Sequence, residues 1–375
     1  MLERRTAITL SNIVLIVATG LLLVLLWQLR SLLVILMIAV VLAAALAPVV
    51  DWADRWNIPR LLTVVVVYLA LIGGLTGFGV IIGPPVFGQI ERLIRQFPVY
   101  LEFVRALAES LAVRLGMTQP ELLRQIFDIQ GLTSWVIGSS QQLLVRSYAV
   151  TSGILGAIFS LILALLISGY MLAGSENLIK GLVNLFPHPW NQRLDAQVKP
   201  MSQRMGRYIQ GRILVAAILG VAITVGLSFL GLSEFSLGLG AIAGFTDLIP
   251  FVGPILGAAP ALLVAISLGW WTFLWVLLLF VIIQNLETYV LDPLLVGSSV
   301  RVHPLYQLLA VLGGTQVLGI VGALIVPPWV AGAAVLLENL YLKPKQLAEQ
   351  QAKVAEYAQT DTLSAIPINS PSLKQ

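Results

Sequence analysis

The sequence predicts an all-α polytopic membrane protein with about eight transmembrane segments of about 20 residues each. Three observations lead to this prediction. Hydrophobic residues make up 58% of the 375 residues and charged residues only 11%, whereas soluble domains carry about 25% charged residues. Apolar runs long enough to span a bilayer recur along the chain. Late in the chain, glycines and prolines interrupt such runs, which predicts broken or re-entrant helices.

Residues 1–85 are expected to form three N-terminal transmembrane helices. Their apolar runs are Ser11–Gln28, Leu32–Val50 and Leu61–Ile82. Arg30-Ser31 predicts a tight turn between the first two helices, and Gly83-Pro84-Pro85 predicts the end of the third, because proline and glycine interrupt helices.

Residues 86–149 are expected to form an extramembrane amphipathic helical module. Apolar residues recur there at helical spacing, for example at Ile90, Ile94 and Leu101. Thr118 begins a Thr-Gln-Pro-Glu capping box, which predicts a further helix. A passive cap or an oligomer surface is the favoured role of this module, and direct contact with a solute is the alternative.

Residues 150–342 are expected to form the transmembrane core, and residues 343–375 a disordered cytoplasmic tail. A basic, amphipathic helix over residues 190–212 is predicted to lie in the membrane interface and to run directly into the next span. The spans predicted in this core are Val150–Leu172, Ile213–Leu230, Ser236–Ala265, Trp270–Val290 and the apolar region from Pro304 to Leu342.

The stretch Ser236–Ala265 is the centre of the functional prediction. A helix cannot run straight through Ile249–Pro254, because each proline removes a backbone donor and clashes with the carbonyl four residues back. The freed backbone groups must be buried in protein or line a wet cavity. A break beside an acid is typical of a solute or ion site near the membrane midplane. The candidate site residues in this stretch are Asp247, Pro250, Gly253, Pro254 and Gly257.

Asp247 is the candidate coupling acid. The carbonyls that end the first half-helix favour a cation, and the amides that begin the second half, from about Ile255, favour a polar or anionic group. The break could therefore hold a proton or a sodium ion beside a small polar solute. Two alternatives remain open at this point: a kinked packing helix, or an Asp247 that caps Phe251 or lies near the membrane interface.

A second polar cluster is formed by Gln284, Asn285 and Glu287. Gln284 and Glu287 are three residues apart, so both can point into the helix bundle from one helical face. An interfacial anchor is an equally good interpretation of this cluster. Asp292 and His303 each precede a proline, and they are interpreted first as loop residues and second as gating or proton-linked residues.

The last apolar region, residues 304–342, is too long for one perpendicular helix. Glycines at 313, 314, 319 and 322 and the pair Pro327-Pro328 interrupt it, which predicts a second broken or re-entrant element. Two such segments late in a chain predict a binding site where they meet.

Several classes of protein are disfavoured by what the sequence lacks. It has no cysteine and only two histidines, so disulfides, zinc–thiolate sites and histidine-rich metal clusters are not expected. It has no Gly-x-x-x-x-Gly-Lys-Ser/Thr phosphate loop and no His-Glu-x-x-His motif. A membrane aspartyl protease would need two aspartates that face each other within the membrane. Asp292, the candidate partner of Asp247, lies at a predicted membrane boundary, so such a pair is not expected. The net charge of +4 does not indicate nucleic-acid binding. We therefore expect no enzyme activity, no cofactor and no metal.

The charge distribution predicts the orientation. If the N-terminus lies inside, every lysine falls on the cytoplasmic side, and so do most of the arginines outside the 86–147 segment. Long translocated segments obey the positive-inside rule poorly, so that segment is left out of the comparison. Both termini are therefore predicted to be cytoplasmic.

Several motifs are spread over roughly residues 10–342: Ala47-Pro48-Val49-Val50-Asp51, Arg207-Tyr208-Ile209-Gln210-Gly211, Ile249-Pro250-Phe251-Val252-Gly253-Pro254, Gln284–Glu287, Asp292-Pro293 and His303-Pro304. In these motifs the chain resembles the autoinducer-2 exporter family of bacterial membrane proteins. This resemblance implies a polytopic inner-membrane transporter with both termini inside, and a homo-oligomer such as a pentamer. Some members of the family export the furanone autoinducer-2, and others are sodium(lithium)/proton antiporters. Pro327-Pro328 departs from the single proline that the family pattern implies there.

Together these observations predict a secondary transporter that exports a small polar, autoinducer-2-like solute and is coupled to protons or sodium. The sodium(lithium)/proton antiporter is the first alternative. A non-transporting membrane scaffold, whose 86–149 module binds a partner, is the alternative from another class.

Overall fold

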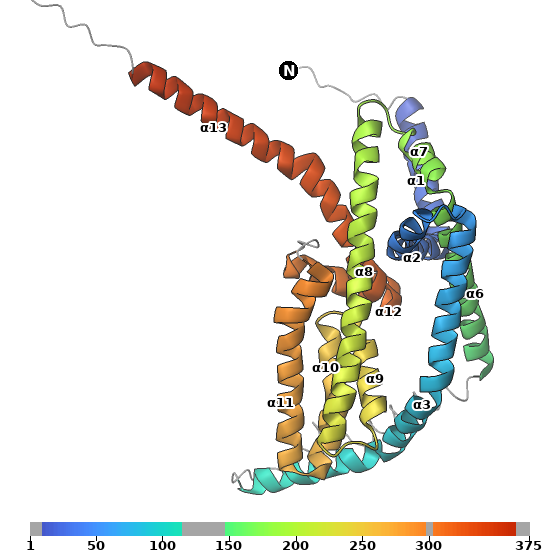
Figure 1. The fold of residues 1–375 in the computed structure, drawn as a ribbon, viewed down its shortest axis with the longest axis vertical. Coiled ribbons are helices and arrows are strands. Elements are labelled where there is room, and N and C mark those ends of the chain that lie inside the picture. Colours follow the sequence, from blue (N-terminus) through green and yellow to red (C-terminus); the bar gives the residue numbers. More distant parts are fainter. Residues whose placement is uncertain (1–9, 115–146, 298–302, 365–375) are drawn as a thin grey trace, which may run out of the picture.

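The computed structural model describes residues 10–114, 147–297 and 303–364, and within these ranges it contains helices and no strands. Figure 1 shows their arrangement, in which the long helix α8 runs through the middle of the molecule. The helices are α1 (Leu10–Gln28), α2 (Arg30–Asp54), α3 (Arg60–Arg114), α6 (Ser147–Ala173), α7 (Ser175–Val183), α8 (Trp190–Phe229), α9 (Ser236–Asp247), α10 (Val252–Leu268), α11 (Trp270–Leu286), the π-helix η1 (Glu287–Gly297), α12 (Pro304–Leu337), the π-helix η2 (Glu338–Leu342) and α13 (Lys343–Ser364).

Five helices in the described ranges are long and apolar enough to cross a membrane. A sixth span results if α6 and α7, which are bent by 86° at a short break, count as one. This confirms the all-α polytopic membrane protein. Two of the eight predicted spans are not among these six: the first, whose apolar helical part is Ile13–Gln28, and Ser236–Ala265, which is divided between α9 and α10.

The junction between the first two helices differs from the prediction. Only Leu29 separates α1 from α2, and helical hydrogen bonds continue across it, from Leu29 N–H to the Leu25 carbonyl and from Leu33 N–H to the Leu29 carbonyl. The change of direction lies at Leu29, one residue before the predicted Arg30-Ser31, and α2 begins at Arg30. No glycine or proline lies at this junction, so nothing forces the backbone to reverse there.

The helix α3 also runs further than expected. It continues through Pro84, Pro85 and Pro98 for 55 residues, so Gly83-Pro84-Pro85 does not end it. A proline can bend a helix without ending it, and α3 curves along its length beneath α9 and α10 (Figure 1). Residues 86–114 are thus continuous with the third span. The capping box at Thr118 lies outside the described residues.

The lower half of α3 supports the start of α9. The Gln89 Oε1 atom accepts a hydrogen bond of 2.7 Å from the backbone N–H of Gly238, one of the amides in the first turn of α9 that have no partner within that helix. Arg92 lies 3.8 Å from Glu234 in the loop before α9. The segment 86–114 therefore fixes the base of the α9–α10 hairpin.

Residues 190–229 form one helix. The structure confirms that residues 190–212 run directly into the next span, and Pro200 lies inside α8 without ending it. Figure 1 shows α8 as one nearly straight rod, so residues 190–212 extend the axis of the spanning part instead of lying across it. The carbonyl of Ala44 on α2 approaches α8 at Gly206, where a side chain would collide with it.

The predicted break after Asp247 is confirmed. The helix α9 ends at Asp247 and α10 begins at Val252, with Phe251 at φ 65° in the turn between them. Gly253 lies against the backbone of Asp247, and Gly257 lies against Ala243. Because these pairs run in opposite directions along the two helices, α9 and α10 form an antiparallel hairpin.

The second predicted break lies at Gly319. Its φ of 64° and ψ of −150° divide α12 into two helical halves, and this backbone region is open almost only to glycine. A Cβ atom at Gly314 would lie 2.5 Å from the Gly322 carbonyl oxygen, so the two halves fold back on each other as a second hairpin. Pro327 and Pro328 are buried inside the second half and do not interrupt it.

The largest hydrophobic core lies where α8, α9, α10 and α11 meet, with contributions from the lower half of α3. Its centre is the α8 face that points toward the α9–α10 hairpin. The most deeply buried members are Val215, Leu227, Leu232, Leu239, Ala261, Val264, Ala265 and Val276.

Candidate functional site

A row of small residues brings α8 and α9 into close contact. This small-residue seam consists of Ala216, Gly220 and Thr224 on α8, and Gly240 and Gly244 on α9. A Cβ atom on Gly244 would lie 2.8 Å from the Ala216 carbonyl oxygen, and one on Gly220 would lie 3.2 Å from the Gly240 carbonyl oxygen. Helices approach this closely only where side chains are small.

The seam determines which polar residues meet at its upper end. Residues four apart lie on one face of a helix, so the α8 row of Thr224, Gly220 and Ala216 continues to Arg212. The α9 row continues from Gly244 to Asp247, three residues on. Arg212 and Asp247 are therefore the next pair along the same contact, and Arg212 Nη2 lies 3.3 Å from Asp247 Oδ1.

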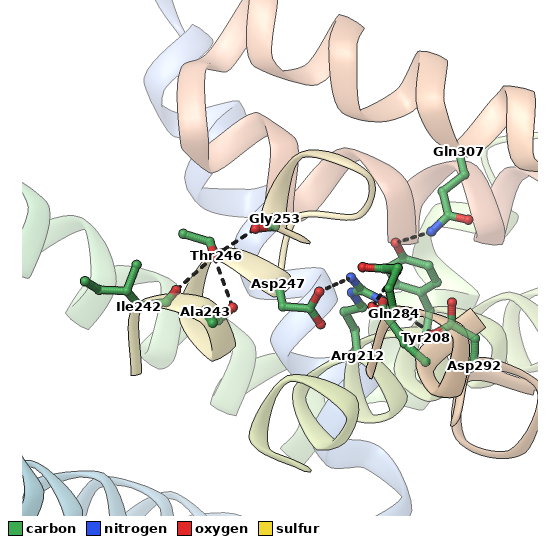
Figure 2. A network of polar contacts seen from close by, with 11 residues as sticks. Tyr208, Arg212, Ile242, Ala243, Thr246, Asp247, Gly253, Gln284, Asp292 and Gln307 are labelled. Atoms are coloured by element: carbon green, nitrogen blue, oxygen red, sulfur yellow. Dashed lines mark hydrogen bonds and ion pairs between the residues drawn. The ribbon is translucent and has the colours of Figure 1, made fainter. Parts of the chain in front are cut away.

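Two more carboxylates approach the same guanidinium from η1. Arg212 Nη1 donates a hydrogen bond of 2.8 Å to Glu287 Oε1 and lies 3.5 Å from Asp292 Oδ1. Gln284 Nε2 donates a hydrogen bond of 2.9 Å to the second oxygen of Glu287. Figure 2 shows Asp247, Gln284 and Asp292 arranged around the guanidinium. We call Arg212, Asp247, Glu287 and Asp292 the Arg212 cluster.

The π-helical form of η1 explains why both of its acids reach one arginine. In an α-helix, residues five apart point about 140° away from each other. The wider turn of a π-helix, with hydrogen bonds from residue i to i+5, brings such residues nearly into line. Glu287 and Asp292 are five apart within η1, and both lie on Arg212 Nη1.

The cluster is buried and its formal charges do not balance. The side chains of Arg212, Asp247 and Glu287 are about one-twentieth exposed or less, and that of Asp292 is 41% exposed. If all groups are ionised, three negative charges face one positive charge among the described residues. Asp247 Oδ2 and Arg212 Nε and Nη2 are buried and have no hydrogen-bond partner within the described part of the chain. A buried ionised group without full compensation costs several kcal/mol, on the order of 3–5 when one partner is missing.

The second hairpin contacts α8 one turn before this cluster. The Tyr208 hydroxyl accepts a hydrogen bond of 3.2 Å from Gln307 Nε2 on the first half of α12. Both broken segments thus contact neighbouring turns of α8, as Figure 2 shows through Gln307, Tyr208, Arg212 and Asp247.

An open pocket of about 300 Å³ lies between α8 and η1, and none of the four cluster residues lines it. Gly211 allows η1 to approach α8 there, since a Cβ atom on it would lie 2.5 Å from the Leu295 carbonyl oxygen. The lining residues are Arg207, Gln210, Gly211, Leu214, Leu294, Leu295 and Val296.

The structure gathers some of the predicted site residues and separates others. Asp247, Gln284, Glu287 and Asp292 meet at Arg212. Asn285 is exposed, and its side chain bonds the Val281 carbonyl of its own helix.

The remaining predicted site residues have local roles in the structure. Pro250, Gly253, Pro254 and Gly257 form the turn and the close contact of the α9–α10 hairpin. His303 is exposed and caps α12 by accepting a hydrogen bond of 3.2 Å from the Leu305 N–H, which agrees with its interpretation as a loop residue.

Sequence reasoning missed Arg212 and Tyr208. The charge pattern placed Arg212 with the basic residues near the headgroups, because it stands at the end of a run that includes Arg204 and Arg207. Its spacing contained the missed signal, since Arg212 lies in line with Ala216 and Gly220 at intervals of four. The cation beside the end of α9 is thus a side chain of the protein itself.

The sequence profile of the AI-2E family transporters matches residues 13–342. The chain belongs to this family. The "Putative transport protein YrrI" of Bacillus subtilis (strain 168) is 29% identical over 314 residues, which cover 82% of this chain and 86% of the relative. The "Putative transport protein MT0215" of Mycobacterium tuberculosis is 29% identical over 319 residues, 82% of this chain and 83% of the relative.

A third AI-2E relative has a name of the same kind. The "Putative permease PerM" of Escherichia coli (strain K12) is 27% identical over 253 residues, which cover 66% of this chain and 70% of the relative. With the family match and the long apolar helices, these relatives identify this AI-2E protein as a multi-pass membrane transporter.

Proposed function

We propose that this AI-2E transporter exports a small polar solute in exchange for protons, and that the Arg212 cluster is its coupling site. One observation carries the proposal: three carboxylates surround one buried guanidinium, and Asp247 Oδ2 is buried without a partner in the described part of the chain. Such a site favours proton uptake, because a bound proton removes one negative charge and occupies almost no volume.

Protonation of Asp247 changes what Arg212 can bind. An ionised Asp247 attracts the guanidinium, whereas a neutral one attracts it far less. Arginine stays charged in proteins, so the guanidinium then has donors available for oxygen atoms of a solute. The solute class that fits is small and oxygen-rich, such as a hydroxylated furanone, because a guanidinium donates several hydrogen bonds in one plane.

The α9–α10 hairpin couples this chemistry to the fold. Asp247 is the last residue of α9, and Gly253 at the start of α10 contacts its backbone. Loss of the Arg212–Asp247 attraction therefore acts directly on the end of the hairpin. Helix ends that lie away from lipid are typical of transporter binding sites.

The arrangement of the helices supports cytoplasmic termini in a bacterial inner membrane. The helices α3 and α8 run in the same direction, and α6 and α11 run in the opposite one (Figure 1). One end of the molecule then carries Arg55, Lys180, Arg193 and Lys343, and basic residues favour the cytoplasmic side. Assembly into a homo-oligomer remains a prediction.

The sodium(lithium)/proton antiporter is the second candidate, and the charge excess of the Arg212 cluster is also the feature that favours it. The three acids point to a guanidinium and not to a shared open space, which makes the proton the preferred ion. A membrane scaffold without transport would require none of this buried charge.

Flux measurements in proteoliposomes test the proposal. Purified protein is reconstituted with an internal pH dye, and a hydroxylated furanone is supplied on one side under imposed proton, sodium or no gradients. The expected result is solute flux that follows the proton gradient and is lost in Asp247→Asn. Asp195→Asn is the matched control, because Asp195 lies on α8 and is exposed. Sodium-driven proton movement without solute would support the antiporter, and no flux of any kind would support the scaffold.

A further inference from the structure

The four members of the Arg212 cluster differ in how far their side chains are exposed. The side chains of Arg212, Asp247 and Glu287 are almost fully buried, whereas that of Asp292 is 41% exposed. Asp292 nevertheless lies on the same guanidinium nitrogen as Glu287. It is therefore the one acid of this cluster that contacts the buried guanidinium and is also open to the surroundings of the chain, where a carboxylate favours water over lipid.

On the basis of the proposed proton coupling, we propose that Asp292 is the residue through which protons pass between water and the buried pair of Asp247 and Glu287. The exposed carboxylate takes up or releases a proton, and the proton moves between it and the buried acids. No bond other than O–H forms or breaks, and the charge of Arg212 does not change.

The distances permit this transfer within one small space. Glu287 Oε1 and Asp292 Oδ1 lie 2.8 and 3.5 Å from the same atom, Arg212 Nη1, so a water or a side-chain rotation can connect the two carboxylates. Asp247 Oδ1 lies 3.3 Å from the neighbouring nitrogen Nη2. Arginine cannot relay the proton itself, because it is not deprotonated in proteins, so the carboxylates are the carriers.

The π-helix places Asp292 in this position. An α-helical register would turn Asp292 away from the side of Glu287. Pro293, the next residue, lies inside η1, and in an α-helix its ring would clash with the carbonyl of Tyr289, four residues back. The proline therefore favours the wider turn that keeps Asp292 on Arg212.

Seven polar side chains of the described ranges form or adjoin the cluster. From α8 they are Arg212 and Tyr208, from α9 Asp247, from α11 Gln284, from η1 Glu287 and Asp292, and from α12 Gln307. Among these side chains of the described ranges, Asp292 is the only acid whose side chain is substantially exposed.

The test uses the full chain in proteoliposomes and records the rate of proton movement on addition of the furanone. Asp292→Asn is expected to slow this movement by about 100-fold or more, since a positioned acid or base typically contributes about 10²- to 10⁴-fold, and Asp292→Glu is expected to retain most of the rate. Small weak acids such as formate or azide, added at millimolar concentration, should restore the rate of Asp292→Asn, because they can carry protons to the buried acids. Asp195→Asn is again the control.

Two results would overturn the inference while leaving the proposed function intact. One is wild-type proton movement in Asp292→Asn. The other is a slow Asp292→Asn that no weak acid restores and that Asp292→Glu shares, which would indicate a structural role. If Asp292→Asn does not fold, Asp292→Ser takes its place in the same assay. Absence of solute-linked proton movement in the wild-type protein would refute the proposed function, and this inference with it.

Discussion

Arg212 on α8 and Asp247 on α9 meet at 3.3 Å at the end of the small-residue seam. The distance between these charges is thus set by residues that carry no charge. Because close packing tolerates little added volume, the coupling site should be sensitive to changes several residues away along the seam.

The first prediction concerns the seam. Gly244→Leu places a large side chain where even a Cβ atom would lie 2.8 Å from the Ala216 carbonyl oxygen. Overpacking of this kind costs about 1–3 kcal/mol, and it should separate Arg212 from Asp247 and abolish proton-coupled flux. Gly313→Ala is the control, because a Cβ atom there would meet no described atom within 4 Å. Thermal unfolding in detergent and flux in vesicles are the measurements.

The second prediction concerns the charge balance. Arg212→Met leaves buried carboxylates without their cation, which should destabilise the fold by about 3–5 kcal/mol. Adding Asp247→Asn and Glu287→Gln to Arg212→Met removes most of that charge, so the triple variant should recover much of the stability. Transport should remain absent in both variants. Equal unfolding temperatures for the single and triple variants would contradict this account of the cluster.

Parts of the fold and the site could be predicted from the sequence, and the reasons are physical. The break after Asp247 follows from Pro250 and Pro254, and the break in α12 lies at one of the glycines in its sequence, Gly319. Gly83-Pro84-Pro85 shows the limit of this reasoning, because α3 continues through the same kind of residues. A proline removes one hydrogen bond, and whether the helix then ends depends on packing that the sequence alone does not display.

The site was also predicted only in part, because packing between helices decides which residues meet. Asp247, Gln284 and Glu287 were found because polar groups in apolar runs are conspicuous. Arg212 was missed because it stands at the end of a basic run, and only the packing of α8 on α9 separates it from that run. The meeting of Glu287 and Asp292 required the π-helical turn of η1, which no periodicity in the sequence indicated.

The third prediction concerns the turn of the second hairpin. Gly319→Ala puts a side chain on a backbone with φ 64° and ψ −150°, which costs about 1–3 kcal/mol. The variant should unfold at a lower temperature than Gly313→Ala, since Gly313 has an ordinary helical backbone with open space around it. An unchanged unfolding temperature for Gly319→Ala would show that α12 does not turn at this residue.

The fourth prediction concerns the contact between α3 and α9. Gln89→Ala removes the acceptor for the Gly238 N–H, and loss of such a cap costs about 1 kcal/mol. The unfolding temperature should fall, and hydrogen exchange of the amides that begin α9 should become faster. Gln346→Ala, at an exposed position on α13, serves as the control. If exchange in α9 matches the wild type, the lower half of α3 does not hold the hairpin.

The central claim is that export and proton movement share one site, and the most direct measurement is the number of protons moved per solute in reconstituted vesicles. Imposed pH gradients and solute gradients are varied until net flux stops, and the balance point gives this ratio. The account predicts a fixed, non-zero ratio for the wild type and for Asp195→Asn, and a ratio of zero for Asp247→Asn. A wild-type balance point that does not depend on the pH gradient would contradict it.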